Sequence, residues 1–230
     1  MRVPDQALAI VEAVAQATSR PVTVKMRLGW DEESLNAPQI ARMAVDAGAR
    51  MITVHGRTRQ QFYKGEARWH LVRAVVEAVP VPVVVNGDIR DTATARKALA
   101  QSGAAAVMLG RGAQGRPWMV GRIGAELAGR TGPDTPRGAE LAALVHAHYE
   151  AMLSEYGTEI GLRAARKHLD WYADAAGLVL DKPTRRALLD NDQPEAVLAL
   201  IDSGAQYSLI HRGLFAELPP AERSLFNMPL

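Results

Sequence analysis

The chain has 230 residues, of which 48% are hydrophobic and 23% charged, and it carries a formal net charge of +2 and no cysteine. The missing cysteines exclude disulfides, cysteine-ligated zinc, iron–sulfur clusters and thiol catalysis within these residues. The composition is typical of a soluble globular protein, and the pI near 9.0 gives only mild support for a polyanionic partner.

Strands and helices alternate over the first 131 residues. Short apolar runs predict four strands, at 21–26, 51–55, 83–85 and 105–109. Apolar residues at helical spacing predict helices that begin near Pro4 and Pro38, that pass through 71–75, and that cover 94–101. This alternation indicates βαβ units, and we therefore expect an α/β fold with a parallel sheet.

The pattern changes near residue 132. A Gly/Pro-rich stretch at 129–138 precedes a segment that has helical periodicity only. We expect one helix from Glu140 to about Tyr156, a second over 162–175, and further short helices in the remainder. The sequence thus predicts two domains, at 1–131 and 132–230, the second of them small and all-helical.

The first residues lack the layout of a signal peptide, and no apolar run is long enough to cross a membrane. We expect a cytoplasmic protein without a membrane partner. The oligomeric state cannot be predicted from the sequence.

Each predicted strand ends at polar residues that are capable of chemistry. These ends are Lys25, His55, Asn86-Gly87-Asp88 and Gly110-Arg111-Gly112. The carboxyl ends of parallel strands form one edge of the sheet, where α/β proteins build their active sites. The set predicts a site for an anionic, hydrogen-bonding ligand and no metal.

Each member of this set also has a simpler interpretation. The Gly-Arg-Gly turn suits a phosphate, or its glycines serve only a tight turn. The Asn-Gly-Asp segment offers hydrogen bonds to a ring or to ribitol hydroxyls, or it is simply a turn. Lys25 meets an anion, neutralises electron density on a redox ring, or forms a structural salt bridge with Asp88 or Glu66. A single histidine such as His55 is more often a satisfied hydrogen-bonding residue, so the set as a whole carries the prediction.

Two basic and aromatic sets indicate RNA. In the helical segment, Arg163, Arg166 and Lys167 are spaced at i, i+3 and i+4 and therefore share a helix face. They adjoin the aromatic residues His168, Trp171 and Tyr172. The alternative is a solvated helix face with Trp171 packed in the core. A second set, in the loop after His55, comprises Arg57, Arg59, Gln60, Tyr63 and Lys64. The resulting candidates for RNA binding are Arg57, Arg59, Arg163, Arg166, Lys167 and His168.

Five segments lie in the order and at the spacing of a known family. They are VKMRLGW (24–30), TVHGRTRQQFYKGEARW (53–69), NGDI (86–89), GRGAQGRPW (110–118) and RAARKHLDWY (163–172). In these segments the chain resembles the bacterial tRNA-dihydrouridine synthases over nearly its whole length.

The resemblance implies an FMN-binding (β/α)8 barrel followed by a helical tRNA-binding domain. It also implies that NADPH reduces FMN, that a hydride passes to C6 of a tRNA uridine, and that a cysteine protonates C5 to give 5,6-dihydrouridine. The FMN contacts that it implies are Lys25, His55, Asn86, Gly87, Asp88, Gly110 and Arg111, with Lys25 and His55 in possible supporting catalytic roles.

The chain departs from the family in one large respect. The family's barrel has four earlier strands and a Gly-Cys-Pro loop that carries the proton-donating cysteine, and these residues have neither. We therefore expect the C-terminal half of a TIM barrel, strands five to eight, followed by the helical domain, with no catalytic cysteine. Two explanations stand: Met1 is an internal methionine of a longer protein, which we favour, or the chain is a truncated remnant.

Two other functions remain open. One is a non-catalytic tRNA-binding fragment that uses the basic helix alone. The other is a different FMN- or phosphate-binding barrel oxidoreductase, such as a dihydroorotate dehydrogenase-like enzyme. The basic helix at 163–172 argues against the second, because an enzyme acting on a small molecule does not need it.

Overall fold

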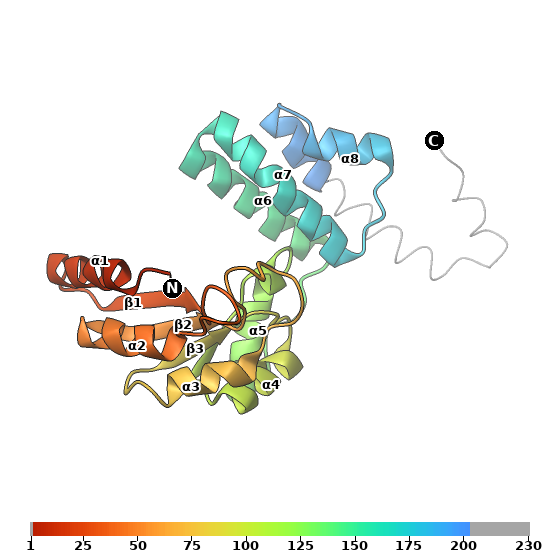
Figure 1. Ribbon diagram of the computed structural model, residues 1–230. Helices are drawn as coiled ribbons and strands as arrows, with labels where there is room; N and C mark the ends of the chain where they lie inside the picture. Colours follow the sequence, from red (N-terminus) through yellow and green to blue (C-terminus); the bar gives the residue numbers. More distant parts are fainter. Residues whose placement is uncertain (1, 203–230) are drawn as a thin grey trace. The chain divides into compact units, whose positions relative to one another are not determined.

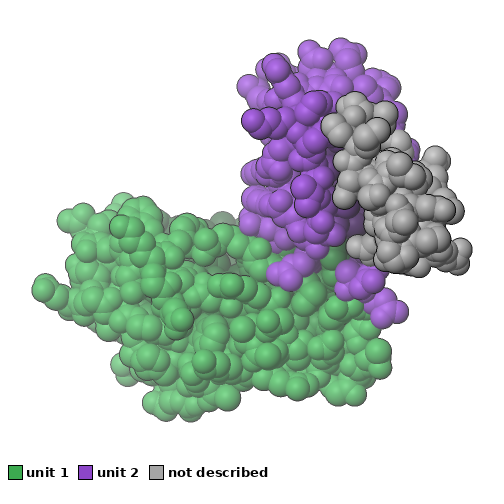
Figure 2. All heavy atoms as spheres, turned by 90° about the vertical axis from the view of Figure 1, so that its right-hand side faces the viewer, with its two compact units in different colours: residues 1–113, 117–133 green, residues 114–116, 134–230 purple. Residues whose placement is uncertain are grey.

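The computed structural model describes residues 2–202, and the chain divides into two compact units (Figure 2). Unit 1 contains the residues up to 113 together with 117–133. Unit 2 contains residues 114–116 and the chain from 134 onward. The short helices expected at the end of the chain lie partly outside the described residues.

Unit 1 is a four-stranded parallel sheet whose strands alternate with helices (Figure 1). Its elements are α1 (Pro4–Ala17), β1 (Val22–Arg27), α2 (Ala37–Asp46), β2 (Ala49–His55), the 3₁₀ helix η1 (Trp69–Val72), α3 (Arg73–Val76), β3 (Val83–Asn86), α4 (Thr92–Ser102), β4 (Ala106–Met108), the 3₁₀ helix η2 (Arg111–Ala113) and α5 (Trp118–Leu127). The strands lie in the order β1-β2-β3-β4, so β1 and β4 are the edges of the sheet within the described residues. The predicted α/β fold with a parallel sheet is confirmed.

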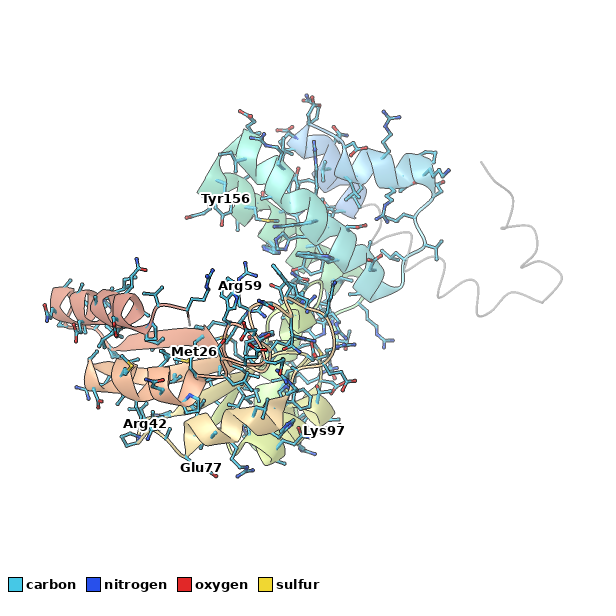
Figure 3. All side chains as sticks on the ribbon, viewed as in Figure 1. Met26, Arg42, Arg59, Glu77, Lys97 and Tyr156 are labelled. Carbon is cyan, nitrogen blue, oxygen red and sulfur yellow. The ribbon has the colours of Figure 1, made fainter. Side chains whose placement is uncertain are left out.

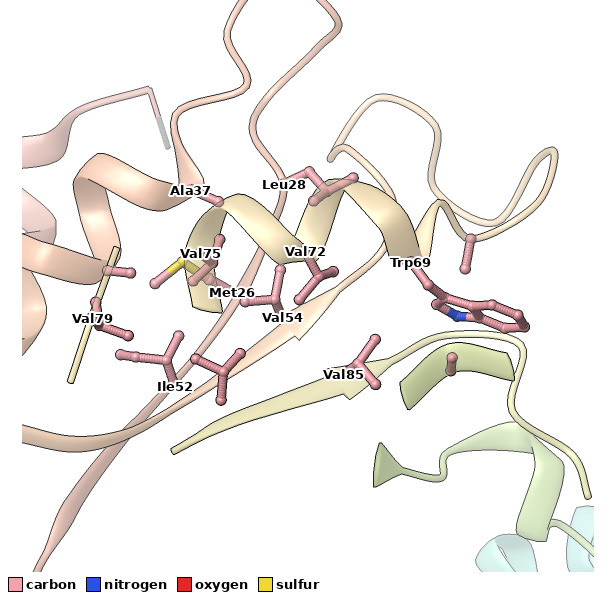
Figure 4. Packing of buried hydrophobic residues seen from close by; sticks show 14 of the residues in the cluster. Met26, Leu28, Ala37, Ile52, Val54, Trp69, Val72, Val75, Val79 and Val85 are labelled. Atoms are coloured by element: carbon pink, nitrogen blue, oxygen red, sulfur yellow. The ribbon is translucent and has the colours of Figure 1, made fainter. Parts of the chain in front are cut away.

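One face of the sheet packs against the helices and forms the core of unit 1. Alternate residues of each strand point to this face, as a period of two requires. Figure 4 shows them against Val72 of η1 and Val75 of α3, both fully buried. The buried strand residues of this core are Met26, Ala49, Ile52, Val54, Val83 and Val85. Burial of each aliphatic side chain contributes about 1.5–3 kcal/mol, so this face fixes how the sheet and helices pack.

Several elements of unit 1 differ in their bounds or kind from the sequence prediction. Strand β1 continues one residue further, to Arg27, and the helix predicted through 71–75 is a 3₁₀ turn followed by the short helix α3. Helix α5 is not predicted at all. It buries Met119 and Ile123, four residues apart, but it follows a Gly- and Pro-rich turn that hides its periodicity.

Unit 2 is helical in its described part. It contains α6 (Gly138–Tyr156), α7 (Thr158–Ala176) and α8 (Lys182–Leu189), and residues 194–202 are also helical. Helices α6 and α7 follow each other with only Gly157 between them. The buried side chains of this unit include Val145, Tyr149, Met152, Ala165, Leu169, Tyr172 and Val197.

Candidate functional site

The sheet residues that point away from the core form two rows across the strands. One row, in cross-strand register, consists of Lys25, Thr53, Val84 and Ala106. The next row, nearer the carboxyl ends, consists of Arg27, His55, Asn86 and Met108. Lys25 therefore lies one row deeper than His55, and Arg27 is the register neighbour of His55. The sequence analysis does not predict Arg27 as a site residue. The signal that could have identified it is its spacing, because residues two apart in a strand lie on the same face and Arg27 is two residues after Lys25.

His55 is buried, with 7% of its surface exposed, and its Nδ1 has no hydrogen-bond partner among the described residues. Burial, followed by the charges of Arg27, Arg57 and Lys25, lowers the pKa of His55 to about 4. The imidazole is therefore neutral at pH 7. A buried nitrogen without a partner in a native structure calls for an explanation, and a bound polar group is one.

Arg57 and Asp88 form a buried ion pair at the end of β3. Arg57 Nη2 lies 2.6 Å from Asp88 Oδ2, and only 3% and 18% of the two side chains is exposed. The same guanidinium donates to the backbone oxygens of Lys64 and Gly65, and Asp88 also accepts from the Ala67 N–H at 2.8 Å. Burial alone would raise the pKa of Asp88, but these hydrogen bonds and the charge of Arg57 hold it below the usual value.

This geometry bears on two of the predicted roles. Arg57 is predicted to contact RNA, but it is buried and its side chain faces Asp88 and the loop backbone. Asp88 is predicted to contact the cofactor, but its Oδ2 accepts hydrogen bonds from Arg57 and Ala67. Asp88 pairs with Arg57 rather than with Lys25, the alternative that the sequence leaves open.

Asn86 and Gly87 are held by the protein in a similar way. Asn86 Nδ2 donates to Met108 O at 2.7 Å, and Trp69 Nε1 donates to Gly87 O at 2.8 Å. Gly87 has φ +111°, and a Cβ there would lie 3.0 Å from His55 Nε2. Only glycine therefore fits between the backbone and the imidazole, so Gly87 shapes the site.

The two glycines of the Gly110-Arg111-Gly112 turn have different surroundings. A Cβ on Gly112 would lie 2.3 Å from Ile89 O, so this glycine is required for close backbone packing. A Cβ on Gly110 would meet nothing within 4 Å, which leaves open space in front of that peptide. Both predicted alternatives thus find support, the tight turn at Gly112 and room for a ligand at Gly110.

Arg27 and Arg111 both lie against the ring of Tyr63. Their Cζ atoms are 5.5 Å and 4.1 Å from the ring centroid, within the range of a cation–π interaction. The Tyr63 ring is in turn 6.5 Å from the His55 ring, in an edge-on orientation. Strands β1 and β2, the loop after β2 and the turn after β4 thus bring these four side chains together.

The charges near this cluster are mainly positive. Lys25 makes no hydrogen bond or ion pair with the described residues, and Arg111 is exposed. The carboxylate of Asp88 is neutralised by Arg57. An excess of cations beside an open glycine turn and a neutral imidazole favours an anionic ligand with a polar planar group.

In unit 2 the predicted basic face is divided between two flanks of α7. Arg163 and Lys167 are exposed, and Lys167 Nζ lies 5.9 Å from the Trp171 ring centroid. Arg166 is half-buried, with an Nε that has no hydrogen-bond partner among the described residues, and its charge acts on Tyr149. Since each residue turns a helix by about 100°, Arg166 and His168 lie on nearly opposite sides.

His168 belongs to an aromatic cluster that joins α6 and α7. Its ring is 5.0 Å from that of Trp171 and 5.1 Å from that of His148, both edge-on. His148 Nδ1 is 3.0 Å from the Tyr172 hydroxyl. Burial, followed by the charges of His148 and Lys167, lowers the pKa of His168. The sequence pattern does not relate His148 to this cluster, because it lies on a different helix.

Within residues 2–202, no group of three or more acidic or histidine side chains is arranged to hold a metal ion. In the same part of the chain, no helix is both long and apolar enough to cross a membrane.

Comparisons with known proteins place this chain among its relatives. A probable tRNA-dihydrouridine synthase of Rhodobacter capsulatus is 56% identical over 203 residues, which cover 88% of this chain and 61% of that protein. One of Rhizobium leguminosarum bv. phaseoli is 44% identical, over 89% of this chain and 64% of that protein. A tRNA-dihydrouridine synthase B of Xanthomonas axonopodis pv. citri is 40% identical, over 96% and 64%.

The chain thus spans about six-tenths of the length of these relatives. A crystal structure of mandelate oxidase aligns at 19% identity with a TM-score of 0.28, which is too low to bear on the fold. The family model described as dihydrouridine synthase (Dus) matches residues 1–208. On the strength of that match and of the identities to the relatives, this chain belongs to the dihydrouridine synthase family.

Proposed function

We propose that this chain takes part in the reduction of uridine to 5,6-dihydrouridine in tRNA, with FMN as cofactor and NADPH as the reductant. The observation that carries the proposal is a group of four side chains, Arg27, His55, Tyr63 and Arg111, which we call the cationic cluster. It lies at the carboxyl ends of β1 to β4, beside the open turn at Gly110. The names of its relatives support the choice of tRNA as substrate.

We infer that β1 to β4 form half of an eight-stranded (β/α)8 barrel and correspond to its strands five to eight. Both edges of the sheet lack a neighbouring strand within the described residues. Helix α1 buries none of its residues and exposes Ile10 and Val14, and Val3 just before it is exposed as well. Edges and apolar faces of this kind are normally covered, and a closed barrel would cover both.

The residues of unit 1 fit a phosphorylated planar cofactor. Gly110 and Arg111 would hold the phosphate, since the turn has room in front of it and a guanidinium forms strong hydrogen bonds with phosphate. Lys25 and His55 would face the ring, with His55 Nδ1 free to bind one of its polar atoms. Asn86, Gly87 and Asp88 would shape the site through the contacts that hold the loop and β4.

FMN, when bound, would supply the hydride for C6 of the uridine. The charges of Lys25 and Arg27 would stabilise negative charge beside them, and the neutral His55 would hold a hydrogen bond without adding charge. We assign the protonation of C5 to no residue of this chain, because it contains no cysteine. The exposed Arg59, Arg163 and Lys167 and the partly buried His168 are the proposed contacts to tRNA. Residues 1–131 would thus bind FMN and contribute Arg59 to the tRNA contacts, and 132–230 would contribute the other tRNA contacts.

The phosphate assignment can be tested by comparing FMN with riboflavin, which lacks the phosphate. We expect the chain to bind FMN more tightly, and Arg111→Ala to remove most of that preference, at a cost of about 1.5–3 kcal/mol in FMN binding. The measurement is a titration that follows flavin fluorescence.

Arg42→Ala, which removes an exposed arginine on α2, is the matched control and should bind FMN as the parent does. Equal affinities of the parent for FMN and riboflavin would contradict the phosphate site.

The absence of cysteine supports one second candidate, a non-catalytic tRNA-binding role. In that case the chain would bind tRNA in a salt-dependent manner, but it would not bind FMN in the same titration.

A further inference from the structure

Phe62 combines two features that the fold does not require. Its side chain is exposed, with 54% of the residue accessible, and it has no place in the hydrophobic core. Its φ is +51°, in the left-handed region that residues other than glycine rarely adopt. Such backbone strain gathers at functional sites, and here it holds a large apolar ring toward solvent.

The backbone around Phe62 is fixed from neighbouring segments. Arg27 Nη1 donates to both Thr58 O and Phe62 O at 2.8 Å. The N–H of Phe62 donates to Arg59 O at 3.2 Å, and that of Arg59 to Gly29 O at 2.9 Å. The loop therefore holds the ring in place through main-chain contacts, although the ring itself packs against no core residue.

Arg59 lies over the exposed ring. Its Cζ is 4.3 Å from the ring centroid of Phe62, and the residue is itself exposed. The next residue, Tyr63, has the same arrangement with Arg111. One loop thus presents two adjacent aromatic rings, each with a guanidinium beside it.

We propose that Phe62 and Arg59 form a stacking subsite for an unstacked nucleobase of RNA, next to the nucleotide that enters the cationic cluster. The flat ring suits any base, and the guanidinium offers both a second stacking surface and a charge for the adjoining phosphate. This proposal rests on the proposed function, because it assumes that the chain binds RNA.

The test uses the full 230-residue chain, an unmodified tRNA transcript and a single-stranded oligouridine. Phe62→Gly is the informative variant, because glycine adopts a φ of +51° without strain and the loop should fold at least as well. We expect its thermal midpoint to stay at or above that of the parent, while its affinity for both RNAs falls about 5- to 150-fold. Phe62→Trp, which keeps a stacking ring, should bind like the parent.

Arg59→Gln tests the charge. We expect it to weaken RNA binding and to lower the slope of log affinity against log salt by about one. The control is Arg42→Gln, which makes the same change on α2, and Figure 3 places Arg42 well away from Arg59. Its affinity and salt slope should match those of the parent.

The outcomes separate this subsite from the function on which it rests. If the parent binds tRNA and Phe62→Gly binds it equally well, the subsite is wrong and the proposed function stands. If Arg59→Gln and Arg42→Gln have the same effect, the charge acts non-specifically and the subsite is again wrong. If the parent binds neither RNA, both proposals fail together.

Discussion

At the scale of single residues, His55 shows how the surroundings fix a protonation state. The side chain is buried beside three cations, so a proton on the imidazole would be both desolvated and repelled. The result is a neutral hydrogen-bonding group in an otherwise positive cluster. Such a group can bind a polar ligand atom without changing its own charge at neutral pH.

This protonation state predicts a dependence of stability on pH. The folded pKa of about 4 lies below the ordinary value of 6.5, so between these values the unfolded chain binds a proton that the folded chain does not. The contribution is complete above pH 6.5, and it is lost as the pH falls toward 4. We expect His55→Gln to flatten this part of the profile by up to about 3 kcal/mol, measured by urea unfolding at a series of pH values.

The same claim can be checked directly by NMR. The imidazole signals of His55 should not titrate between pH 5 and 8. A midpoint near 6.5 for His55 would show that neither burial nor the neighbouring cations perturb it.

The residue types at the strand ends predict where the site lies, but they do not predict which contacts each residue makes there. The positions of His55 and Arg111 follow from the strand pattern alone. The pairing of Arg57 with Asp88 does not, because it joins residues from two loops that are 31 positions apart. The role of Arg27 depends on cross-strand register, and a single apolar run does not reveal register.

At the scale of elements, the loop at 56–68 is held by hydrogen bonds to several other segments of unit 1. Arg59 and Gln60 donate backbone hydrogen bonds to Gly29 and Trp30, and Gly56 donates to Asn86. The Arg57–Asp88 pair joins the loop to the end of β3. A long loop held in this way can present Phe62 and Tyr63 at fixed positions.

We expect the buried ion pair of this loop to contribute more to stability than its more exposed ion pair. Asp88→Asn should lower the free energy of unfolding by about 3 kcal/mol, because it leaves the buried guanidinium of Arg57 without its counter-charge. Glu32→Gln is the matched change in the more exposed pair with Arg68, and it should cost about 0–1 kcal/mol. Urea denaturation of both variants measures the difference, and similar costs would mean that burial of Arg57 has little energetic effect.

Helices and strands with a clear hydrophobic periodicity could be predicted from the sequence. Elements that begin next to Gly- and Pro-rich turns could not. All four strands follow from short apolar runs, although only β3 is buried along its whole length. Helix α5 was missed because Gly and Pro residues surround its start. In α7 the helix and its basic residues are predicted, but the pattern does not reveal that Arg166 is half-buried and that its charge acts on Tyr149 of α6.

At the scale of the whole molecule, the chain consists of two units with different surfaces. Unit 1 carries the cationic cluster and the open turn, whereas unit 2 carries the aromatic cluster of His148, His168 and Trp171. The proposed flavin contacts therefore belong to unit 1, whereas the proposed RNA contacts on α7 belong to unit 2. They should respond separately to mutation.

Lys167→Ala should weaken binding of a tRNA transcript about 3- to 10-fold and lower the salt slope by about one, because it removes one exposed charge. Its affinity for FMN should equal that of the parent. Filter binding and flavin fluorescence measure the two properties on the same preparation.

Lys97→Ala, which removes an exposed lysine of α4, provides the control and should change neither property (Figure 3). Loss of FMN affinity in Lys167→Ala would show that the two surfaces are not independent.

The order of the sheet has a consequence for how unit 1 folds. Every pair of hydrogen-bonded strands is also consecutive in the chain, β1 with β2, β2 with β3, and β3 with β4. The register partners of these parallel strands nevertheless lie 22 to 31 residues apart, so each pairing must first close a βα connection, a feature that slows folding relative to local contacts. During synthesis β2, β3 and β4 can each pair with the strand made before it as soon as its own βα unit leaves the ribosome.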